Sequence, residues 1–587
     1  MLTIPSGAMG RTSSRALTNL YGAARMQVTF WILIITYALW NCSAAFGGEV
    51  WNNISVGKFY KFSTPPTALY PDRWPVTVLA GGTNRELSHG AKLTDGEFDT
   101  TSSPWPLEKW VAWHDTSFEV IIDLGKAHPV SHIHARAASR TEWAIAYPAK
   151  LTISVSSDGT VWRPYGGSVT FRAASGAGWE VNEVQGTGGW TYDTRFVRYA
   201  FEPVAGQHIF LDELWVEGSI SHTTKEASHD GAYHGAFPAT EQGYLRLNEF
   251  ENETGRRATM VLWYAGWDAP FTTTVGQLID NPTSPSWIGD RKLEIGFLPT
   301  SPNSPGGISC TETSSCITSA RIAAGSHDQF LFDWFVEAAT RNRPFWIRPM
   351  NEMNGSWTWS QNNPPNNIHD LRSLRYGGDP STYRWAWRRM YNIAEQAGAT
   401  GERQIFVWAP DVHNDPDNGG GPTDLRVYYP GPQYVDWIGF SLYKGDPGES
   451  YEGLLKSAYN RDYTDDPLWR HSVSAKPFMI VEGGAVEFKV EVNPPGDVAQ
   501  FQQLVGCWIP AGEYTSSGSK YTATSSGPKY TVTLLNKPQF IRDWFYRLPL
   551  LEIPVKAAVW FDRLSQCEHI STSEESLRAY RPYFFDR

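Results

Sequence analysis

Cysteine, and the motifs built on it, are scarce in this chain. Its 587 residues contain five cysteines, none of them in a CxxC pair, and no HExxH motif is present. These absences argue against a structural or catalytic zinc site. The G-x-S-x-G elbow, the phosphate loop and the Gly-rich dinucleotide fingerprint are also missing, which disfavours acyl, phosphoryl and hydride transfer. We therefore expect no metal and no cofactor.

Positive charge is also in deficit. The net charge of −11 argues against nucleic acid or an anionic membrane as the main partner. Charged residues make up 19% of the chain and hydrophobic residues 41%, which is typical of a globular protein. Because 587 residues are too many for one ordinary core, we expect two or more domains.

No acidic residue precedes Glu49. The leader contains three arginines, followed by an apolar run from Val28 to Trp40 and by small residues at 43–45. This order is typical of a signal peptide, and the run is short for a membrane span. We expect 1–45 to be a signal peptide of a secreted, extracellular protein, with an uncleaved signal anchor that tethers it to a membrane as the alternative.

Four cysteines remain after such a leader. In an oxidising compartment an even number suggests two disulfides, and four cysteines allow three pairings. We favour Cys310–Cys316, which closes a small loop, together with Cys507–Cys567.

Aromatic residues are abundant, with 27 Trp, 27 Tyr and 28 Phe. Indole rings are costly to leave exposed without a use, and the apolar face of a sugar is a common use. Large aromatic cores account equally well for the same counts, so composition leaves both interpretations open.

Residues 47–220 are predicted to be an all-β sandwich. The runs that alternate or are apolar are 118–126, 149–166, 195–203 and 209–218, and turn signals such as Asp158-Gly159 separate them. The order of short motifs, from LTDG at 93–96 to DELWVEG at 212–218, resembles that of the discoidin-like, galactose-binding-like jelly roll. The resemblance implies either glycan binding or a spacer role.

The stretch 221–250 is read as a linker or as the first loop of the region that follows, because its polar part lacks periodicity. From 251 to 587, apolar strands alternate with amphipathic helices such as 328–341 and 379–398, which predicts a (β/α)8 TIM barrel. The predicted strands are 259–266, 293–299, 343–349, 403–410, 435–443, 476–484 and 555–563, with a further strand guessed within 319–325.

Two polar stretches of this region are expected to be surface features. Residues 411–421 are acidic and Gly-rich but fail the calcium-loop pattern, so we expect a solvated loop. Residues 514–534 form a polar insertion before the last strand, predicted to be a hairpin or loop.

Two carboxylates stand at the ends of predicted strands. Glu352 follows RPFWI and Glu482 ends FMIV, about three strand–helix units apart, so both should face the barrel mouth. Glycoside hydrolysis uses one acid and one carboxylate. Either Glu alone is better explained by a rim ion pair with Arg348 or Arg563. Two at matching strand ends favour a site, with the carboxyls about 5–5.5 Å apart if the mechanism is retaining.

Three stretches, RPMNEMNGSWTWS at 348–360, YYPGPQYVDWIGFSLY at 428–443 and KPFMIVEGG at 476–484, resemble glycoside hydrolase family 26. The resemblance spans roughly 255–565. It implies a retaining double displacement on a clan A barrel. It also implies a β-linked polysaccharide substrate, since the family contains β-mannanases with some β-glucanases and β-1,3-xylanases.

Carried over residue by residue, the resemblance makes Glu352 the acid/base and Glu482 the nucleophile. Trp357 matches a sugar-stacking indole, and Tyr443 matches a tyrosine that contacts the sugar and the nucleophile. We expect a raised pKa for Glu352 and an ionised Glu482, held by Tyr443 and a basic neighbour such as Arg348.

The aromatic residues Trp408 and Trp560 lie at strand ends where further subsites would be, although each fits a core position equally well. Asn351 stands where mannanases of the family usually carry His. Asparagine is typical of the wider clan, where it bonds the sugar 2-hydroxyl, so this position weakens the mannan assignment.

The leading hypothesis from the sequence is an endo-β-1,4-mannanase. A β-1,3(1,4)-glucanase or β-1,3-xylanase of the same fold is the alternative, and a catalytically inactive glycan-binding protein is the alternative of another class. We expect a monomer that binds β-linked polysaccharide, with a second glycan at the N-terminal sandwich and no nucleic acid.

Overall fold

The computed structural model describes most of two β-rich regions. The described ranges are 50–72, 77–78, 86–87, 92–99, 109–176, 178–220, 232–240, 244–267, 269–298, 319–353, 380–399, 403–412, 425–444, 448–460, 476–485, 488–493, 514–517, 520–523, 529–547, 555–562 and 574–580. Within these ranges, no helix combines the length and the hydropathy of a membrane span. The predicted signal segment and all five cysteines lie outside them.

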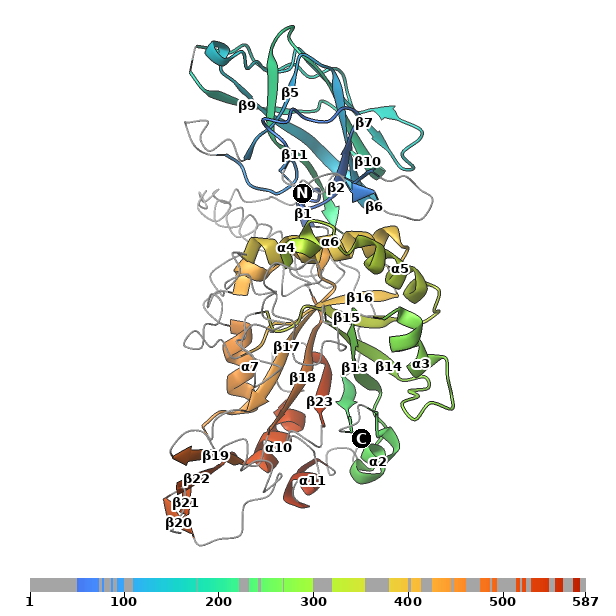
Figure 1. Cartoon of the computed structure of the whole chain (residues 1–587), viewed down its shortest axis with the longest axis vertical. Helices are drawn as coiled ribbons and strands as arrows, with labels where there is room; N and C mark the ends of the chain where they lie inside the picture. Colours follow the sequence, from blue (N-terminus) through green and yellow to red (C-terminus); the bar gives the residue numbers. More distant parts are fainter. Residues whose placement is uncertain are drawn as a thin grey trace, which may run out of the picture. The chain divides into compact units, whose positions relative to one another are not determined.

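The N-terminal region is an antiparallel sheet of nine strands, drawn in blue to teal in Figure 1. Its main path runs β1-β11-β6-β10-β7-β8, and β2, β5 and β9 pair with strands of this path. The strands are β1 (Val50–Asn53), β2 (Phe59–Phe62), β5 (Val111–His114), β6 (Phe118–Ser139), β7 (Lys150–Ser156), β8 (Arg163–Pro164), β9 (Glu180–Gln185), β10 (Thr191–Glu202) and β11 (His208–Ile220). A separate pair joins β3 (Thr77–Val78) to β4 (Glu86–Leu87).

Strand β6 organises this sheet because its 22 residues pair with four other strands. Its first part is flanked by β2 and β10, and its last part by β9 and β11. Buried and less buried residues alternate along its first eight positions, as expected of a strand with one face in a core. The prediction of an antiparallel β region is confirmed, and the discoidin-like sandwich stays a prediction.

The second region is a closed barrel of eight parallel strands, coloured from green to red in Figure 1. In barrel order they are β12 (Tyr233–Phe237), β13 (Met260–Gly266), β14 (Lys292–Leu298), β15 (Phe345–Pro349), β16 (Gln404–Trp408), β17 (Trp437–Lys444), β18 (Phe478–Ala485) and β23 (Val555–Phe561). The predicted TIM barrel is therefore confirmed.

Two details of the predicted barrel are wrong. Its first strand, β12, lies inside 221–250, which the sequence predicts to be a linker or the first loop of this region. Five residues, YHGAF, are too few for a visible alternation, and Gly235 weakens the strand signal. The strand guessed within 319–325 is instead helix α4 (Ser319–Ala323), a run rich in alanine, the best helix former.

Helices alternate with the barrel strands as predicted. The two expected over 328–341 and 379–398 correspond to α5 (Asp328–Ala339) and α6 (Pro380–Gln396). The others are α2 (Leu247–Thr254), α3 (Gln277–Ile279), α7 (Tyr451–Asn460), α10 (Lys537–Arg547) and α11 (Glu574–Tyr580). The predicted insertion before the last strand contributes to a four-stranded antiparallel sheet of β19 (Phe488–Asn493), β22 (Lys529–Leu534), β21 (Lys520–Ala523) and β20 (Tyr514–Ser517).

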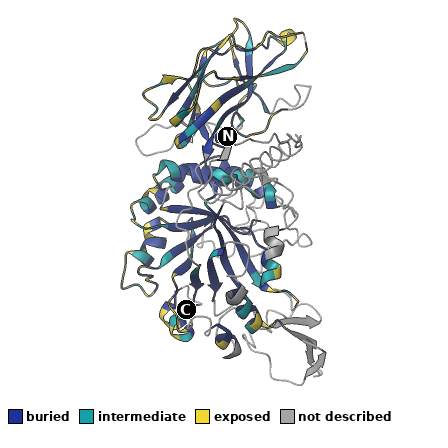
Figure 2. Ribbon diagram, turned by 180° about the vertical axis from the view of Figure 1, so that it is seen from behind, coloured by how far each residue is buried: buried dark blue, intermediate teal, exposed yellow. Residues whose placement is uncertain are grey.

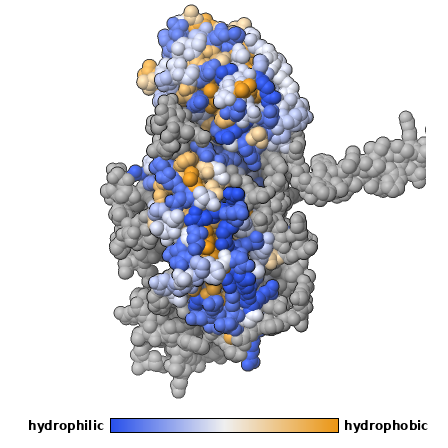
Figure 3. All heavy atoms as spheres, turned by 90° about the vertical axis from the view of Figure 1, so that its right-hand side faces the viewer, coloured by the Kyte–Doolittle hydropathy of each residue, from blue (hydrophilic) through white to orange (hydrophobic). Residues whose placement is uncertain are grey.

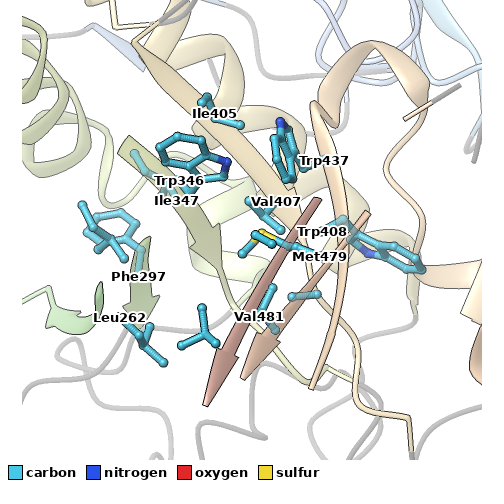
Figure 4. Close-up of a cluster of buried hydrophobic side chains, with 14 of the residues drawn as sticks. Leu262, Phe297, Trp346, Ile347, Ile405, Val407, Trp408, Trp437, Met479 and Val481 are labelled. Carbon is cyan, nitrogen blue, oxygen red and sulfur yellow. The ribbon is translucent and has the colours of Figure 1, made fainter. Parts of the chain in front are cut away.

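The barrel strands are buried along almost their whole length, as the dark blue ribbons of Figure 2 show. Side chains from six neighbouring strands, β13 to β18, gather in the cluster drawn in Figure 4. Several indoles take part, among them Trp346, Trp408 and Trp437. Much of the aromatic content is therefore core. On the face drawn in Figure 3, hydrophilic residues predominate among the described atoms and hydrophobic ones are scattered.

Candidate active site

The two predicted carboxylates lie on the fourth and seventh strands of the barrel. Glu352 follows β15, and Glu482 is the fifth residue of β18. Both belong to the C-terminal ends of parallel strands, the face on which such barrels carry their chemistry. The expected separation by three strands is confirmed.

The chain reaches Glu352 through an uncommon backbone path. Met350 and Glu352 have positive φ values of 47° and 57°, a region that costs a non-Gly residue about 1–3 kcal/mol. Backbone hydrogen bonds hold this path: the Met350 N–H donates to Phe297 at 3.3 Å, and the Glu352 N–H donates to Ala409 at 2.7 Å. Neighbouring strands thus fix the direction in which Asn351 and Glu352 leave the barrel.

Asn351 is buried, and its side-chain oxygen has no hydrogen-bond partner among the described residues. A buried amide oxygen without a donor is costly. Such an atom, on the residue directly before Glu352, is suited to accept a hydrogen bond from a hydroxyl of a bound molecule.

Strand register brings Tyr264 and Arg348 together across a glycine. Tyr264 of β13 lies level with Gly296 of β14, which lies level with Arg348 of β15. A Cβ at Gly296 would stand 2.6 Å from the Tyr264 ring, far inside van der Waals contact. The missing side chain therefore lets the tyrosine ring cross the intervening strand to meet the arginine.

Glu482 is held by these two residues. The Arg348 Nη2 lies 2.5 Å from the Glu482 Oε2, and the Tyr264 hydroxyl donates to the same oxygen. Arg348 also donates to the Tyr264 oxygen at 3.0 Å. The predicted contact of Arg348 with Glu482 is confirmed. The tyrosine found on the carboxylate is Tyr264, which sequence reasoning missed.

The predicted tyrosine, Tyr443, lies near this group on β17. It is level with Gly484 of β18, two residues beyond Glu482, and its ring meets that of Phe561 edge-on at 5.9 Å. It is partly buried against the barrel core. Its contact with a sugar stays a prediction.

The ionisation of Glu482 is set by its cationic partner. Burial alone would raise the pKa of this carboxyl, but the charge of Arg348 and the hydrogen bonds from Glu352, Tyr264 and Arg348 together lower it. Glu482 is therefore the ionised member of the pair at neutral pH, as predicted.

Glu352 has the opposite tendency. Burial raises its pKa well above the ordinary value, and the negative charges of Glu482 and Asp411 raise it further. A hydrogen bond between the carboxyls of Glu352 and Glu482 contributes to both shifts. The raised pKa predicted for Glu352 is confirmed, and the proton of the pair belongs on this residue.

The mutual effect of the two carboxyls on their pKa values indicates that they face each other at the barrel mouth. A separation of about 5–5.5 Å, as in a retaining pair, against about 6.5–9.5 Å in an inverting pair, stays a prediction.

Asp411 completes a row of polar groups along neighbouring strand ends. It is buried and pairs with Ser441 of β17 in a parallel bridge, and Ser441 lies level with Glu482. The sequence predicts a solvated loop over 411–421. That is wrong for Asp411 and Val412, which are buried, because each is tied to the neighbouring strand through Ser441. Residues 413–421 lie outside the described ranges.

Two of the indoles predicted to contact substrate are core residues. Trp408 and Trp560 are both buried. Trp408 packs edge-on against Tyr429, and Trp560 packs on Trp544 and Tyr580. Figure 4 places Trp408 in the hydrophobic cluster. Of the two roles that the sequence allows, the structure supports the core role for both residues. A strand end in this barrel is buried as deeply as its middle.

Several predicted residues lie outside the described ranges. These are the stacking residue Trp357 and the cysteines of both proposed disulfides, Cys310–Cys316 and Cys507–Cys567. Their roles stay predictions. Among the described residues, no three His, Cys, Asp or Glu side chains are grouped so that they could hold a metal ion.

Sequence reasoning overlooked three residues around the pair, Tyr264, Glu294 and Asp411. Glu294 is an isolated charge inside the apolar run LEIGFLP, and its buried carboxyl lies 3.0 Å from Arg348. A lone charge in a predicted buried strand was the available signal for Glu294. Asp411 directly follows a predicted strand, as Glu352 does. Nothing local distinguished Tyr264 from the other aromatic residues.

Chemically, the site is an acid next to a carboxylate, with an arginine and a phenol to stabilise the carboxylate. This is the division of roles that glycosidic bond cleavage requires.

A sequence match favours this chemistry over a structural ion cluster. Residues 329–457 match glycosyl hydrolase family 26. The matched segment includes Arg348, Asn351 and Glu352 and ends before Glu482. It supports a glycoside hydrolase barrel.

Two curated relatives and a solved structure are similar to the chain. The mannan endo-1,4-beta-mannosidase A and B of Caldalkalibacillus mannanilyticus is 32% identical over 145 residues, which cover 24% of this chain and 22% of that protein. Endoglucanase H of Acetivibrio thermocellus is 21% identical over 377 residues, 63% of this chain and 32% of that protein. Bacillus subtilis mannanase has a TM-score of 0.33 at 14% identity, over 62% of this chain and 86% of that one.

The chain thus spans between about a fifth and a third of the length of these curated relatives. The family match and the mannosidase match support a hydrolase of the glycoside hydrolase family 26 type.

Proposed function

We propose that the barrel is a retaining endo-β-glycanase and that its favoured substrate is β-1,4-mannan. The observation that carries this proposal is the opposite pKa shift of two buried carboxyls at the fourth and seventh strand ends, each of which acts on the other. Burial and the charge of Glu482 raise the pKa of Glu352. Burial also acts to raise the pKa of Glu482, but Arg348 and the hydrogen bonds to this carboxyl together lower it. Glu352 can therefore donate a proton at the same pH at which the ionised Glu482 can attack.

In the first step, Glu482 attacks the anomeric carbon while Glu352 protonates the departing glycosidic oxygen. The Arg348 guanidinium and the Tyr264 hydroxyl keep the attacking oxygen ionised and aimed. In the second step, Glu352, now a carboxylate, removes a proton from water, which attacks the same carbon and releases Glu482. Two inversions at one carbon retain its configuration.

The substrate class is proposed from the relatives and from Asn351. The relative of higher identity is a mannan endo-1,4-beta-mannosidase, and the more widely matched one is an endoglucanase. The side-chain oxygen of Asn351 has no hydrogen-bond partner within the described ranges. It is suited to a sugar 2-hydroxyl, which is axial in mannose and equatorial in glucose and xylose. A mixed-linkage β-glucan or β-1,3-xylan is therefore the alternative substrate.

The test is the release of reducing sugar from mannan, mixed-linkage β-glucan, β-1,3-glucan and β-1,3-xylan. Proton NMR of the first product gives the stereochemistry, and the β-anomer is expected. The α-anomer as first product would refute the double displacement. Binding to a polysaccharide with no product, in a folded protein, would instead favour the inactive glycan-binding protein.

The N-terminal sheet supports a second proposal, that of a discoidin-like sandwich that binds a glycan. Trp190 and Tyr192 are both exposed, at 53% and 74%, and their rings lie 6.3 Å apart with planes inclined by only 25°. Near-parallel exposed rings suit the apolar faces of consecutive sugars. Retention of wild-type binding to insoluble mannan and glucan by a Trp190→Ala, Tyr192→Ala variant would contradict this role for the pair.

Three further expectations from the sequence are kept as proposals. The protein is secreted after cleavage behind Ala45, and Cys310–Cys316 and Cys507–Cys567 form two disulfides in a monomer. Intact mass and N-terminal sequencing of protein from the culture medium test the cleavage. Peptide mapping without reduction tests the pairing, and light scattering tests the monomer.

A further inference from the structure

Glu294 is a buried carboxyl for which the mechanism above has no use. It lies on β14, and its side chain is fully buried. Its Oε1 lies 3.0 Å from the Nε of Arg348, and neither of its oxygens has an aligned hydrogen bond within the described part of the chain. A buried acid with a cation beside it but no aligned donor is costly to keep, which points to a role in the site.

Arg348 stands between Glu294 and the proposed nucleophile. Its Nε lies 3.0 Å from Glu294, and its Nη2 lies 2.5 Å from Glu482. In strand register, Glu294 is two residues before Gly296 and is level with Trp346, which is two residues before Arg348. Glu294 therefore supports the guanidinium from deeper in the barrel, through a nitrogen other than the one that holds Glu482.

We propose that Glu294 is a positioning residue for the hydrolysis, one that fixes the Arg348 guanidinium and sets how much of its positive charge serves Glu482. The inference rests on the proposed function, because it takes Glu482 as the nucleophile. Glu294 acts through Arg348 and has no role in bond breaking itself.

The protonation state of Glu294 decides whether Arg348 is shared between two carboxylates. Burial raises the pKa of Glu294 to about 8, the charge of Arg348 opposes the rise, and that of Glu482 adds to it. Within the described part of the chain, these two are the charged groups that act on Glu294. Below that pH, Glu294 is neutral and Arg348 serves Glu482 alone. Above it, two carboxylates share one guanidinium, and the hold on the nucleophile weakens.

The substitution Glu294→Gln keeps the size of the side chain and removes its ionisation. In the wild-type protein, kcat/KM should fall on the alkaline side more steeply than the loss of one proton allows, because Glu294 and Glu352 both ionise there. The kcat/KM of the variant should fall on the alkaline side with the slope of a single ionisation. The acidic limb of its pH profile should coincide with that of the wild type. At pH 9, it should keep a several-fold larger fraction of its maximal kcat/KM than the wild type keeps. Identical alkaline limbs would overturn the proposal.

The matched control is Asp328→Asn. Asp328 forms a buried ion pair with Arg389 elsewhere in the same barrel, with both side chains 3% exposed. Its substitution should lower the melting temperature and leave the shape of the pH profile unchanged. A changed alkaline limb in this control would mean that the limb reports stability, and would overturn the inference from Glu294→Gln.

Thermal unfolding separates a failure of this inference from a failure of the proposed function. The ordinary pKa of a glutamate carboxyl is 4.5, and in the folded protein the pKa of Glu294 is raised to about 8. The stability linked to this proton is therefore complete below about pH 4.5 and is lost as the pH rises through 8. The melting temperature of the wild type relative to Glu294→Gln should fall between pH 5 and 9. A flat difference would overturn the inference, whereas a falling difference in a chain that cleaves no polysaccharide would refute the proposed function alone.

Discussion

Replacing Arg348 by methionine should damage both the stability and the ionisation of the site. The side chain is fully buried, between Glu294 at 3.0 Å and Glu482 at 2.5 Å. Methionine keeps the apolar stem and removes the cation, so the buried Glu482 carboxylate loses its counter-charge. Removing one partner of a buried pair costs about 3–5 kcal/mol, and we expect a loss of free energy of unfolding in this range at pH 8.

The loss should depend on pH in a direction that the pKa shifts fix. With Arg348 present, the pKa of Glu482 is lowered, so its ionisation stabilises the fold above the unfolded value and this contribution disappears as the pH falls. Without Arg348, burial raises the pKa instead, and Glu482 takes up a proton on folding. The difference in stability between wild type and variant therefore grows from pH 5 to pH 8.

Melting curves from pH 5 to 9, together with kcat/KM, measure both effects. For a barrel of this size, the melting temperature of Arg348→Met should be lower than that of the wild type by roughly 5–10 °C at pH 8. Its kcat/KM should be lower by about 10²–10³-fold. Arg389→Met is the control, since it breaks the buried pair with Asp328 and should cost stability without lowering kcat/KM in the folded protein. A deficit for Arg348→Met that is equal at pH 5 and pH 8 would refute the reasoning.

Three further substitutions test separate parts of the site. Glu482→Ala should lower kcat by about 10⁴-fold or more with an unchanged circular dichroism spectrum, and full activity would remove Glu482 from the nucleophile role. Asn351→His should raise the ratio of mannan to glucan activity, and an unchanged ratio would place the choice in the loops. Gly296→Ala sets a methyl group 2.6 Å from the Tyr264 ring, so it should cost about 1–3 kcal/mol of stability and lower kcat. The control is Gly448→Ala, where a Cβ meets nothing within 4 Å, and an equal cost in both would contradict the crowding argument.

The pair of carboxyls, Glu352 and Glu482, was predictable because its signals are local. Each carboxylate follows an apolar run, and strand ends of a parallel barrel meet on one face. Arg348 was predictable for the same reason, since it belongs to the strand that leads into Glu352. The opposite ionisation of the pair followed from placing two acids together in a buried site.

The remaining partners depend on register between strands far apart in the sequence. Tyr264 reaches Glu482 across 218 positions of the chain, and only the alignment of β13, β14 and β15 shows that Gly296 opens its path. Strand β12 was missed because five residues with a central glycine carry too little pattern. Trp408 and Trp560 were ambiguous because an indole at a strand end has the same sequence signature in a core and in a subsite.

The polar groups around the pair come from a continuous run of strands, β13 to β18, while β12 and β23 complete the cylinder by pairing with each other. Closure of the ring therefore joins a strand that begins at residue 233 to one that ends at residue 561, a contact of very long sequence separation and hence slow to form. During refolding from denaturant, tryptophan burial should recover first and hydrolytic activity last. The delay between the two signals measures the time that the first strand needs to find the eighth.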